Sequence, residues 1–306
     1  MEDRKFMYII LIALIGSMAI TWGIQGATLA SLPSATGTNS GQTYYITISG
    51  STTCYPIIEQ AANDFMVNYS NYNIRVSSGG SSTGIKNAEL GISDIGMASR
   101  DVKAPPDENS TGKLIDWVFA SDGIAIIFDK NNNHGMTNLT LQQLFLIYNG
   151  TYTTWNQLGS SYTGDIDVVT RAAGSGTRAS FEELVTYNGE QLGDNPGYIA
   201  NVGSYTTEAE NPGVASYVAS HPDSIGYVGL GFVNDQQLIA AKISTNGTDY
   251  YSPSIASVKA GEYPISRNLH LITNGKPAPY ILTFLDYIYG PRGQEIVAKE
   301  GFVSLY

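Results

Sequence analysis

Polar and apolar side chains alternate along the chain in two periods, one typical of strands and the other of helices. Residues 44–49 alternate like a strand and run into Gly50, and residues 57–69 carry apolar side chains at helical spacing after Pro56. The same criteria predict further strands at 74–77, 94–97, 123–128, 166–170 and 263–273, and further helices at 83–90, 140–148, 179–187, 279–289 and 294–299.

This order of elements, with short connections, predicts an α/β protein with a parallel sheet and crossover helices. The run at 123–128 is apolar throughout, which is typical of a fully buried parallel strand. Thr140 stands where a helix N-cap is expected, before the apolar positions of 141–148.

The N-terminal 43 residues follow a different pattern. Residues 6–24 form an uncharged, mainly apolar stretch after Lys5, about long enough to cross a bilayer as one helix. Residues 1–25 are therefore predicted to be a signal peptide or a membrane anchor, and both alternatives stay open. Residues 26–43, rich in Ser, Thr and Gly, predict a flexible tether. Either alternative predicts that the rest of the chain lies outside the cytoplasm, secreted or anchored through this segment.

Charge and composition narrow the function classes. The 306 residues suffice for two lobes with separate cores, and the net charge of −11 argues against nucleic acid as a partner. A small anion is still compatible with that charge, because a buried anion responds mainly to local dipoles. The lone Cys54 excludes an internal disulfide and is expected to pack as a small apolar side chain. His134, His221 and His270 lack metal or triad spacing, so no metal, cofactor or catalytic residue is expected.

In three places a predicted strand leads through a loop rich in Gly, Ser and Thr into a predicted helix. These loops span 49–53, 78–84 and 171–178. A helix N-terminus offers unpaired N–H groups and a partial positive charge, and glycine lets an anion approach the backbone closely. One such loop is most often only a helix cap. Three together predict an anion-binding site.

Five blocks in this region form a pattern of higher specificity. They are Gly50-Ser51-Thr52-Thr53 with Pro56, Gly79–Lys86, Asp94–Arg100, Asp122–Ala125 and Arg171–Arg178, and the segments 141–155 and Tyr263–Arg267 accompany them. In this order and spacing the blocks resemble the phosphate-specific ABC-transporter substrate-binding proteins, over roughly residues 44–303. The resemblance implies a type II periplasmic-binding-protein fold with two α/β lobes and a ligand cleft between them. Lobe I would comprise 44–122 and 267–306, lobe II would comprise 123–266, and two crossover strands would join them near 122–125 and 264–268.

The resemblance also implies which residues bind phosphate. Carried over position by position, they are Thr52, Thr53, Ser81, Arg171, Ser175, Gly176 and Thr177, with Ser51 adjacent.

Two positions depart from the family pattern. Some relatives have Asp after the serine of the third strand and accept a hydrogen bond from protonated phosphate there, whereas Ser99 is followed here by Arg100. Either Arg100 contacts the anion, or another acid is the acceptor. Asp122 is the leading candidate, and Asp94 and Asp101 are weaker ones. An acid sometimes found in the third loop is replaced here by Ala173, which leaves Arg171 less neutralised.

The implied function is extracytoplasmic binding of inorganic phosphate by a monomer and delivery to the membrane permease of an ABC importer through hinge closure. Other readings are binding of tungstate, molybdate or sulfate, phosphate sensing without transport, a surface adhesion protein, and a hydrolase using Ser175 or Ser51. A carboxylate acceptor would favour phosphate over sulfate, because only phosphate carries a proton near neutral pH and an unpaired buried polar group is costly.

Overall fold

The computed structural model describes residues 41–194, 197–203 and 205–306. The predicted signal peptide or anchor at 1–25 and residues 26–40 of the predicted tether lie outside these ranges. Within the described part of the chain, no helix combines the length and the apolar character that a membrane span requires.

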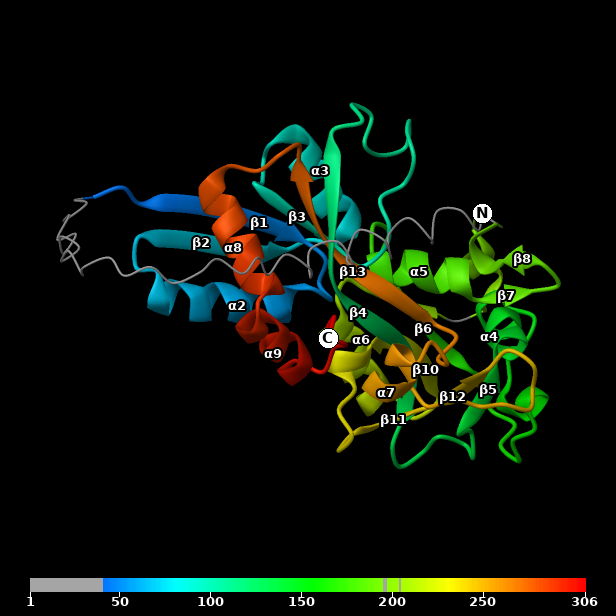
Figure 1. Cartoon of the computed structure of the whole chain (residues 1–306). Coiled ribbons are helices and arrows are strands. Elements are labelled where there is room, and N and C mark those ends of the chain that lie inside the picture. The colour runs from blue at the N-terminus through cyan, green and yellow to red at the C-terminus, as the bar shows by residue number, and fades with distance from the viewer. Residues whose placement is uncertain (1–40, 195–196, 204) are drawn as a thin grey trace, which may run out of the picture. The chain divides into compact units, whose positions relative to one another are not determined.

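A nine-stranded sheet organises the chain, with the strand order β2-β1-β3-β13-β4-β10-β6-β9 and β11 paired to β4 (Figure 1). Its strands are β1 (Tyr44–Gly50), β2 (Tyr72–Ser78), β3 (Ile95–Ala98), β4 (Leu114–Asp129), β6 (Asp167–Arg171), β9 (Tyr205–Glu208), β10 (Ser224–Gly229), β11 (Leu238–Ala240) and β13 (Ser266–Asn274). Two small sheets pair β5 (Asn138–Thr140) with β12 (Lys242–Ser244), and β7 (Thr186–Tyr187) with β8 (Glu190–Gln191).

Helices connect and cover these strands. They are α2 (Tyr55–Asn68), α3 (Ser81–Leu90), α4 (Leu141–Tyr148), α5 (Gly176–Leu184), α6 (Asn211–Ser220), α7 (Ile255–Lys259), α8 (Pro279–Tyr289) and α9 (Pro291–Lys299), with short 3-10 turns at Trp155–Leu158, Leu192–Asp194, Tyr198–Asn201 and Leu230–Phe232. As predicted, crossover helices link parallel strands, since β1 is parallel to β2 and β3, and β6 is parallel to β9 and β10.

The predicted parallel strand at 123–128 is part of β4, but its predicted direction is wrong. β4 is 16 residues long and runs antiparallel to β13, β10 and β11. Residues 123–128 are all buried, and this burial explains the uninterrupted apolar run. Burial of both faces says nothing about the direction of the neighbouring strands, so the apolar run is compatible with parallel and with antiparallel neighbours.

The described residues form two large hydrophobic cores, and β4 contributes side chains to both. One gathers residues of β1, α2, α8 and α9 around Phe65 and Phe284, and the other gathers residues of α4, α5 and β10 around Trp155 and Tyr227. β4 and β13 run side by side between the two groups of elements (Figure 1). The predicted lobe boundaries at 122/123 and 266/267 stay a prediction.

The capping interaction at the start of α4 can be tested separately from any ligand. The Thr140 hydroxyl accepts a hydrogen bond from the Gln143 N–H, and the Gln143 side chain accepts one from the Thr140 N–H. We expect Thr140→Ala to lower the free energy of unfolding by about 1 kcal/mol, because the Gln143 N–H loses its acceptor. Urea unfolding measures this change, and Gln142→Ala in the same helix is an exposed control. Equal stability of the two variants would contradict the assigned cap.

Candidate functional site

The three loops that the sequence singled out converge on one buried cluster. Arg171 Nη2 donates to the Thr52 hydroxyl at 3.1 Å, which joins the third loop to the first. The Thr53 and Thr177 hydroxyls lie 3.1 Å apart and join the same two loops a second time. The second loop meets the third where the Ser82 N–H donates to the Gly174 carbonyl at 3.2 Å. Residues far apart in the sequence therefore form a common site.

Helix N-termini and glycines bring the backbone close to this site. α3 begins at Ser81 and α5 at Gly176, so the unpaired N–H groups of both helices start in the cluster. A Cβ on Gly176 would lie 2.1 Å from the Ser81 hydroxyl oxygen, and one on Gly80, whose φ is +88°, would lie 3.0 Å from the Gly174 carbonyl oxygen. Only glycine fits these two positions, and the loops can therefore approach one another and a ligand closely.

Arg171 is 1% exposed and is held by four acceptors. Its Nε donates to the Glu208 carbonyl, Nη1 to the Asn211 side-chain oxygen, and Nη2 to the Ala209 carbonyl and Thr52. Burial lowers the pKa of Arg171 to about 10, which reflects the cost of keeping this cation away from water.

Sequence reasoning did not identify Arg267 or Asn211 as site residues. Arg267, on β13, donates from Nε and Nη2 to Asp122 and from Nη2 to the Thr53 and Thr177 hydroxyls. Its Nη1 is buried and has no hydrogen-bond partner within the described residues. The sequence signal that could have pointed to Arg267 is its place in the segment 263–267, which resembles the family. Asn211, the first residue of α6, donates to Thr53 at 3.0 Å, and no motif pointed to it.

Asp122 is fully buried beside Arg267. Its Oδ2 accepts both Arg267 hydrogen bonds, and its Oδ1 accepts the Leu230 N–H at 2.9 Å. Burial raises the pKa of Asp122, and the Arg267 charge and the Leu230 N–H oppose that shift.

The cluster carries a positive balance of buried charge. Arg171 and Arg267 contribute two cations and Asp122 one carboxylate, while the nearby Arg178 is partly exposed and paired with Glu182. An uncompensated buried charge is costly, and the N-termini of α3 and α5 add partial positive charge. The arrangement is therefore chemically suited to a small anion.

Several predicted site residues lie beside the cluster with their side chains engaged elsewhere. The Ser51 hydroxyl accepts the Thr53 and Cys54 N–H groups, and the Ser175 hydroxyl caps α5 by accepting the Arg178 N–H. The Arg100 guanidinium pairs with both carboxylate oxygens of Glu108 at 2.5 and 2.8 Å and also donates to Ser82. The structure thus directs the charge of Arg100 to a neighbouring acid and not into the cluster.

The two weaker acceptor candidates lie outside the cluster. Asp94, just before β3, accepts the N–H and the hydroxyl of Thr47 in the middle of β1. Asp101 is 88% exposed and lies 3.3 Å from His270 Nε2. Within the described residues, no three His, Cys, Asp or Glu side chains are placed so that together they could hold a metal ion. Cys54 is buried as predicted, its Sγ donates to the Ala98 carbonyl, and burial raises its pKa to about 12.

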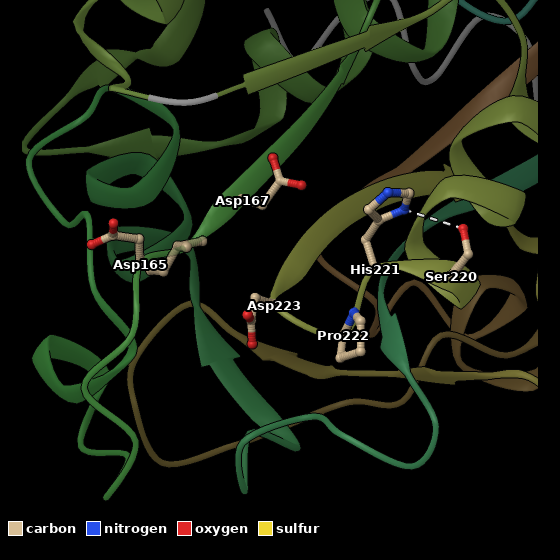
Figure 2. Close-up of a pocket in the computed structure, with 7 residues that line it drawn as sticks. Asp165, Asp167, Ser220, His221, Pro222 and Asp223 are labelled. Atoms are coloured by element: carbon tan, nitrogen blue, oxygen red, sulfur yellow. Dashed lines mark hydrogen bonds between the residues drawn. The ribbon is translucent and has the colours of Figure 1, made fainter.

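A surface pocket of about 490 Å³ lies elsewhere, between β6 and the end of α6 (Figure 2). Asp165, Asp167 and Asp223 line it together with His221, whose Nδ1 is hydrogen-bonded to Ser220. Three carboxylates around one hollow disfavour an anionic ligand. The charge of this pocket is therefore opposite to that of the buried cluster.

Comparison with known proteins places this fold in a class. The family described as the PBP superfamily domain matches residues 33–292, and the chain belongs to that superfamily. Within it, the chain belongs to the phosphate ABC-transporter substrate-binding proteins. The predicted α/β class and type II periplasmic-binding-protein fold are thereby confirmed. Proteins of this family are extracytoplasmic substrate-binding proteins.

Individual relatives cover nearly the whole chain. The phosphate-binding protein PstS of Bacillus subtilis is 28% identical over 307 residues, which span 100% of this chain and 95% of the relative. A structure described as a phosphate ABC transporter substrate-binding protein with bound phosphate, from Clostridium perfringens, is 33% identical with a TM-score of 0.74 and covers 86% of this chain and 100% of that one. An ABC-type phosphate transport receptor from Vibrio cholerae is 26% identical with a TM-score of 0.66, covering 84% and 99%.

Proposed function

We propose that this protein binds inorganic phosphate in the buried cluster and delivers it to the permease of an ABC importer. The observation that carries the proposal is the convergence of three loops on two buried arginines and one buried carboxylate. Relatives named phosphate-binding proteins and a related structure with bound phosphate support the choice of phosphate among small anions.

Donors from all three loops would hold the tetrahedral ligand. Thr52 and Thr53 of the first loop and Thr177 of the third would donate hydroxyls, and Arg171 would supply a guanidinium. Because the Ser51 and Ser175 hydroxyls already cap their own loops, these residues would act through their backbone. Ser81 and Gly176 would offer N–H groups at the starts of α3 and α5. Arg100 would act indirectly by holding Ser82.

Hinge closure is the proposed mechanism. The first and second loops belong to the proposed lobe I (44–122 and 267–306) and the third to the proposed lobe II (123–266). A ligand that bridges the two lobes stabilises the closed form by its higher affinity for that form. The closed monomer would dock on the permease. Residues 1–25 would act as a cleaved signal or as an anchor, with 26–43 as the tether.

The hydrolase alternative needs a serine beside a base. Within the described residues, the Ser51 and Ser175 hydroxyls accept hydrogen bonds from backbone N–H groups, and no His takes part in these bonds. This geometry favours binding without turnover. Binding of another tetrahedral oxyanion is a stronger alternative to phosphate binding than the hydrolase is.

Isothermal titration calorimetry of the full chain with phosphate, arsenate, sulfate and molybdate tests the proposal. We expect saturable binding of one phosphate per chain, with the ligand recovered unchanged. Hydrolysis of phosphate esters, or no saturable binding of any of the four anions, would contradict it. Saturable binding of molybdate alone would replace phosphate by the rival ligand.

A further inference from the structure

The chain carries five copies of the tripeptide Asn-x-Ser/Thr, which the proposed phosphate site does not use. This tripeptide is the acceptor sequence for N-linked glycans in exported proteins, and proteins of this family are extracytoplasmic. It also arises by chance in a chain rich in Asn and Thr, so the surroundings of each copy decide whether a glycan can be attached. The asparagines are Asn68, Asn109, Asn138, Asn149 and Asn246.

Asn246 lies in an exposed turn between β12 and α7 (Figure 1). Residues 245–249 are all exposed, and the middle residue of the tripeptide, Gly247, has a φ of +79°. A Cβ on Gly247 would meet no atom of the described residues within 4 Å. Another macromolecule can therefore approach this turn without displacing the rest of the fold.

The turn brings the two functional groups of the tripeptide together. The Thr248 hydroxyl donates to Asn246 Oδ1 at 3.0 Å, and the Thr248 N–H donates to the same oxygen at 2.9 Å. Side chains of Asn commonly organise turns through such bonds to the residue two positions on. A glycan transferase that must recognise the amide and the hydroxyl would find both at one point of the surface.

The amide of Asn246 is also held in one orientation. Oδ1 accepts the Ser244 hydroxyl at 3.0 Å and the Asp249 N–H at 2.9 Å, while Nδ2 donates to the Asp249 carboxylate at 2.7 Å. Nδ2 carries two N–H groups, and this bond uses one of them. Because the folded turn already orders the side chain, an enzyme that binds it loses less conformational entropy in doing so.

Two of the other asparagines are engaged in the fold. Asn138 pairs with Lys242 in the ladder of β5 and β12, and the hydroxyl of its Thr140 caps α4. Asn109 is half-buried, and its Oδ1 accepts the Leu114 N–H at 2.9 Å. Glycan attachment at either position would disturb these contacts.

The remaining two are also less suitable than Asn246. Asn149 is half-buried, and a Cβ on the following Gly150 would lie 2.3 Å from the Asn201 carbonyl oxygen, so neighbouring backbone crowds this tripeptide. Asn68 is exposed, but it is the last residue of α2 and its Nδ2 donates to the Asp64 carbonyl of the same helix. Of the five tripeptides, the one at Asn246 combines exposure with a contact between amide and hydroxyl.

We propose that Asn246 is an N-glycosylation site of this protein, with a lipid-phosphate-linked oligosaccharide as the glycan donor. A bond forms between Asn246 Nδ2 and the anomeric carbon of the first sugar, and the bond between that carbon and the phosphate oxygen of the donor breaks. The Nδ2 proton passes to a base of the transferase, and the lipid phosphate leaves with the bonding electrons. Nothing is oxidised or reduced.

This inference goes beyond the proposed function and does not depend on it. The side-chain hydrogen bonds of Asn246 all stay within residues 244–249, so no residue of the buried cluster is attached to the turn through them. A glycan there is expected to cover the turn and to leave phosphate affinity unchanged, since a glycan is bulky and stays at the surface.

Mass spectrometry of the full chain, isolated from the cells that make it and digested with trypsin, tests the proposal. Trypsin cuts after Lys and Arg, and the resulting peptide 243–259 has Asn246 as its only asparagine. We expect this peptide to be heavier than its amino-acid sequence by the mass of a glycan and to release sugar fragment ions. Peptides 104–113 and 131–171, which contain Asn109, Asn138 and Asn149, are internal controls and should have the masses of their sequences.

Two variants made in the same cells identify the attachment atom. Thr248→Ala should lose the glycan although Asn246 is retained, and Thr248→Ser should keep it, because serine retains the hydroxyl. Calorimetry should give both variants the phosphate affinity of the wild type.

A wild-type peptide 243–259 without a glycan, or one changed only by hydrolysis of Asn246 to Asp, would overturn the inference. A glycan that persists on this peptide in Thr248→Ala would do so as well, because attachment would then not follow the tripeptide. Either result leaves the proposed phosphate binding standing, and a failure to bind phosphate would not affect the glycosylation result.

Discussion

Alanine at Arg171 is expected to abolish the stabilisation of this protein by phosphate while the fold is retained. Arg171 is buried and joins Thr52 of the first loop to Asn211 of α6, so its loss removes a cation and opens the contact between the loops. Removing one member of a buried, hydrogen-bonded charge pair typically costs about 2–5 kcal/mol of binding energy, which is about 30-fold to several thousand-fold in affinity. Thermal unfolding with and without phosphate measures the effect, and calorimetry gives the affinity directly.

Arg292→Ala is the matched control for that variant. It also removes one positive charge, but from a half-exposed side chain paired with Asp64 and Glu295 away from the cluster. We expect its response to phosphate to equal that of the wild type and its stability to change little, because water screens an exposed ion pair. An Arg171→Ala variant that phosphate still stabilises to the wild-type extent would rule out the assigned role of Arg171.

Alanine at Gly84 should cause the largest loss of stability among the substitutions considered. Gly84 lies in the first half of α3, where the helix rests directly on β1 and β3. A Cβ there would lie 2.4 Å from the Met97 carbonyl oxygen and 2.8 Å from the Gly50 Cα. Both are backbone atoms, so α3 must move. We expect a loss of about 3 kcal/mol, or about 6–12 °C in the unfolding midpoint.

The displacement of α3 by Gly84→Ala would also move Ser81 and weaken phosphate binding. Gly203→Ala is the control, because a Cβ at Gly203 meets no atom of the described residues within 4 Å. Urea unfolding and phosphate titration of the two variants check both expectations. Equal stability of the two variants would show that α3 does not pack on the sheet as closely as described.

The sequence alone was most informative where local pattern and packing agree. β1, α2, β2 and α3 were all predicted, because alternation, helical spacing and glycine-rich turns mark them within short windows. The helix predicted at 179–187 instead spans 176–184, because Ser175 caps it earlier than expected and 186–187 pair with β8. No elements were predicted between 188 and 262. There β9, β11 and β12 have only three or four residues and carry almost no periodic signal, but the ten-residue α6 and the six-residue β10 were missed as well.

The loops of the site also followed from the sequence, because Gly, Ser and Thr before a helix are a local signature of anion binding. The charged partners did not. Asp122 and Arg267 are 145 residues apart, and only the pairing of β4 with β13 brings them together. Arg100 precedes its partner Glu108 by eight residues, yet no local pattern favoured that acid over a ligand as the partner of Arg100.

The sequence thus determined the class of fold, the three loops and the kind of ligand, since these depend on residue types within short segments. Tertiary structure decided the direction of β4, the commitment of Asp122 and Arg100 to protein partners, and the presence of Arg267 and Asn211 in the cluster. The physical reason is that a buried charge takes its partner from whichever elements pack around it, and that packing is set by the whole sheet and not by neighbours in the chain.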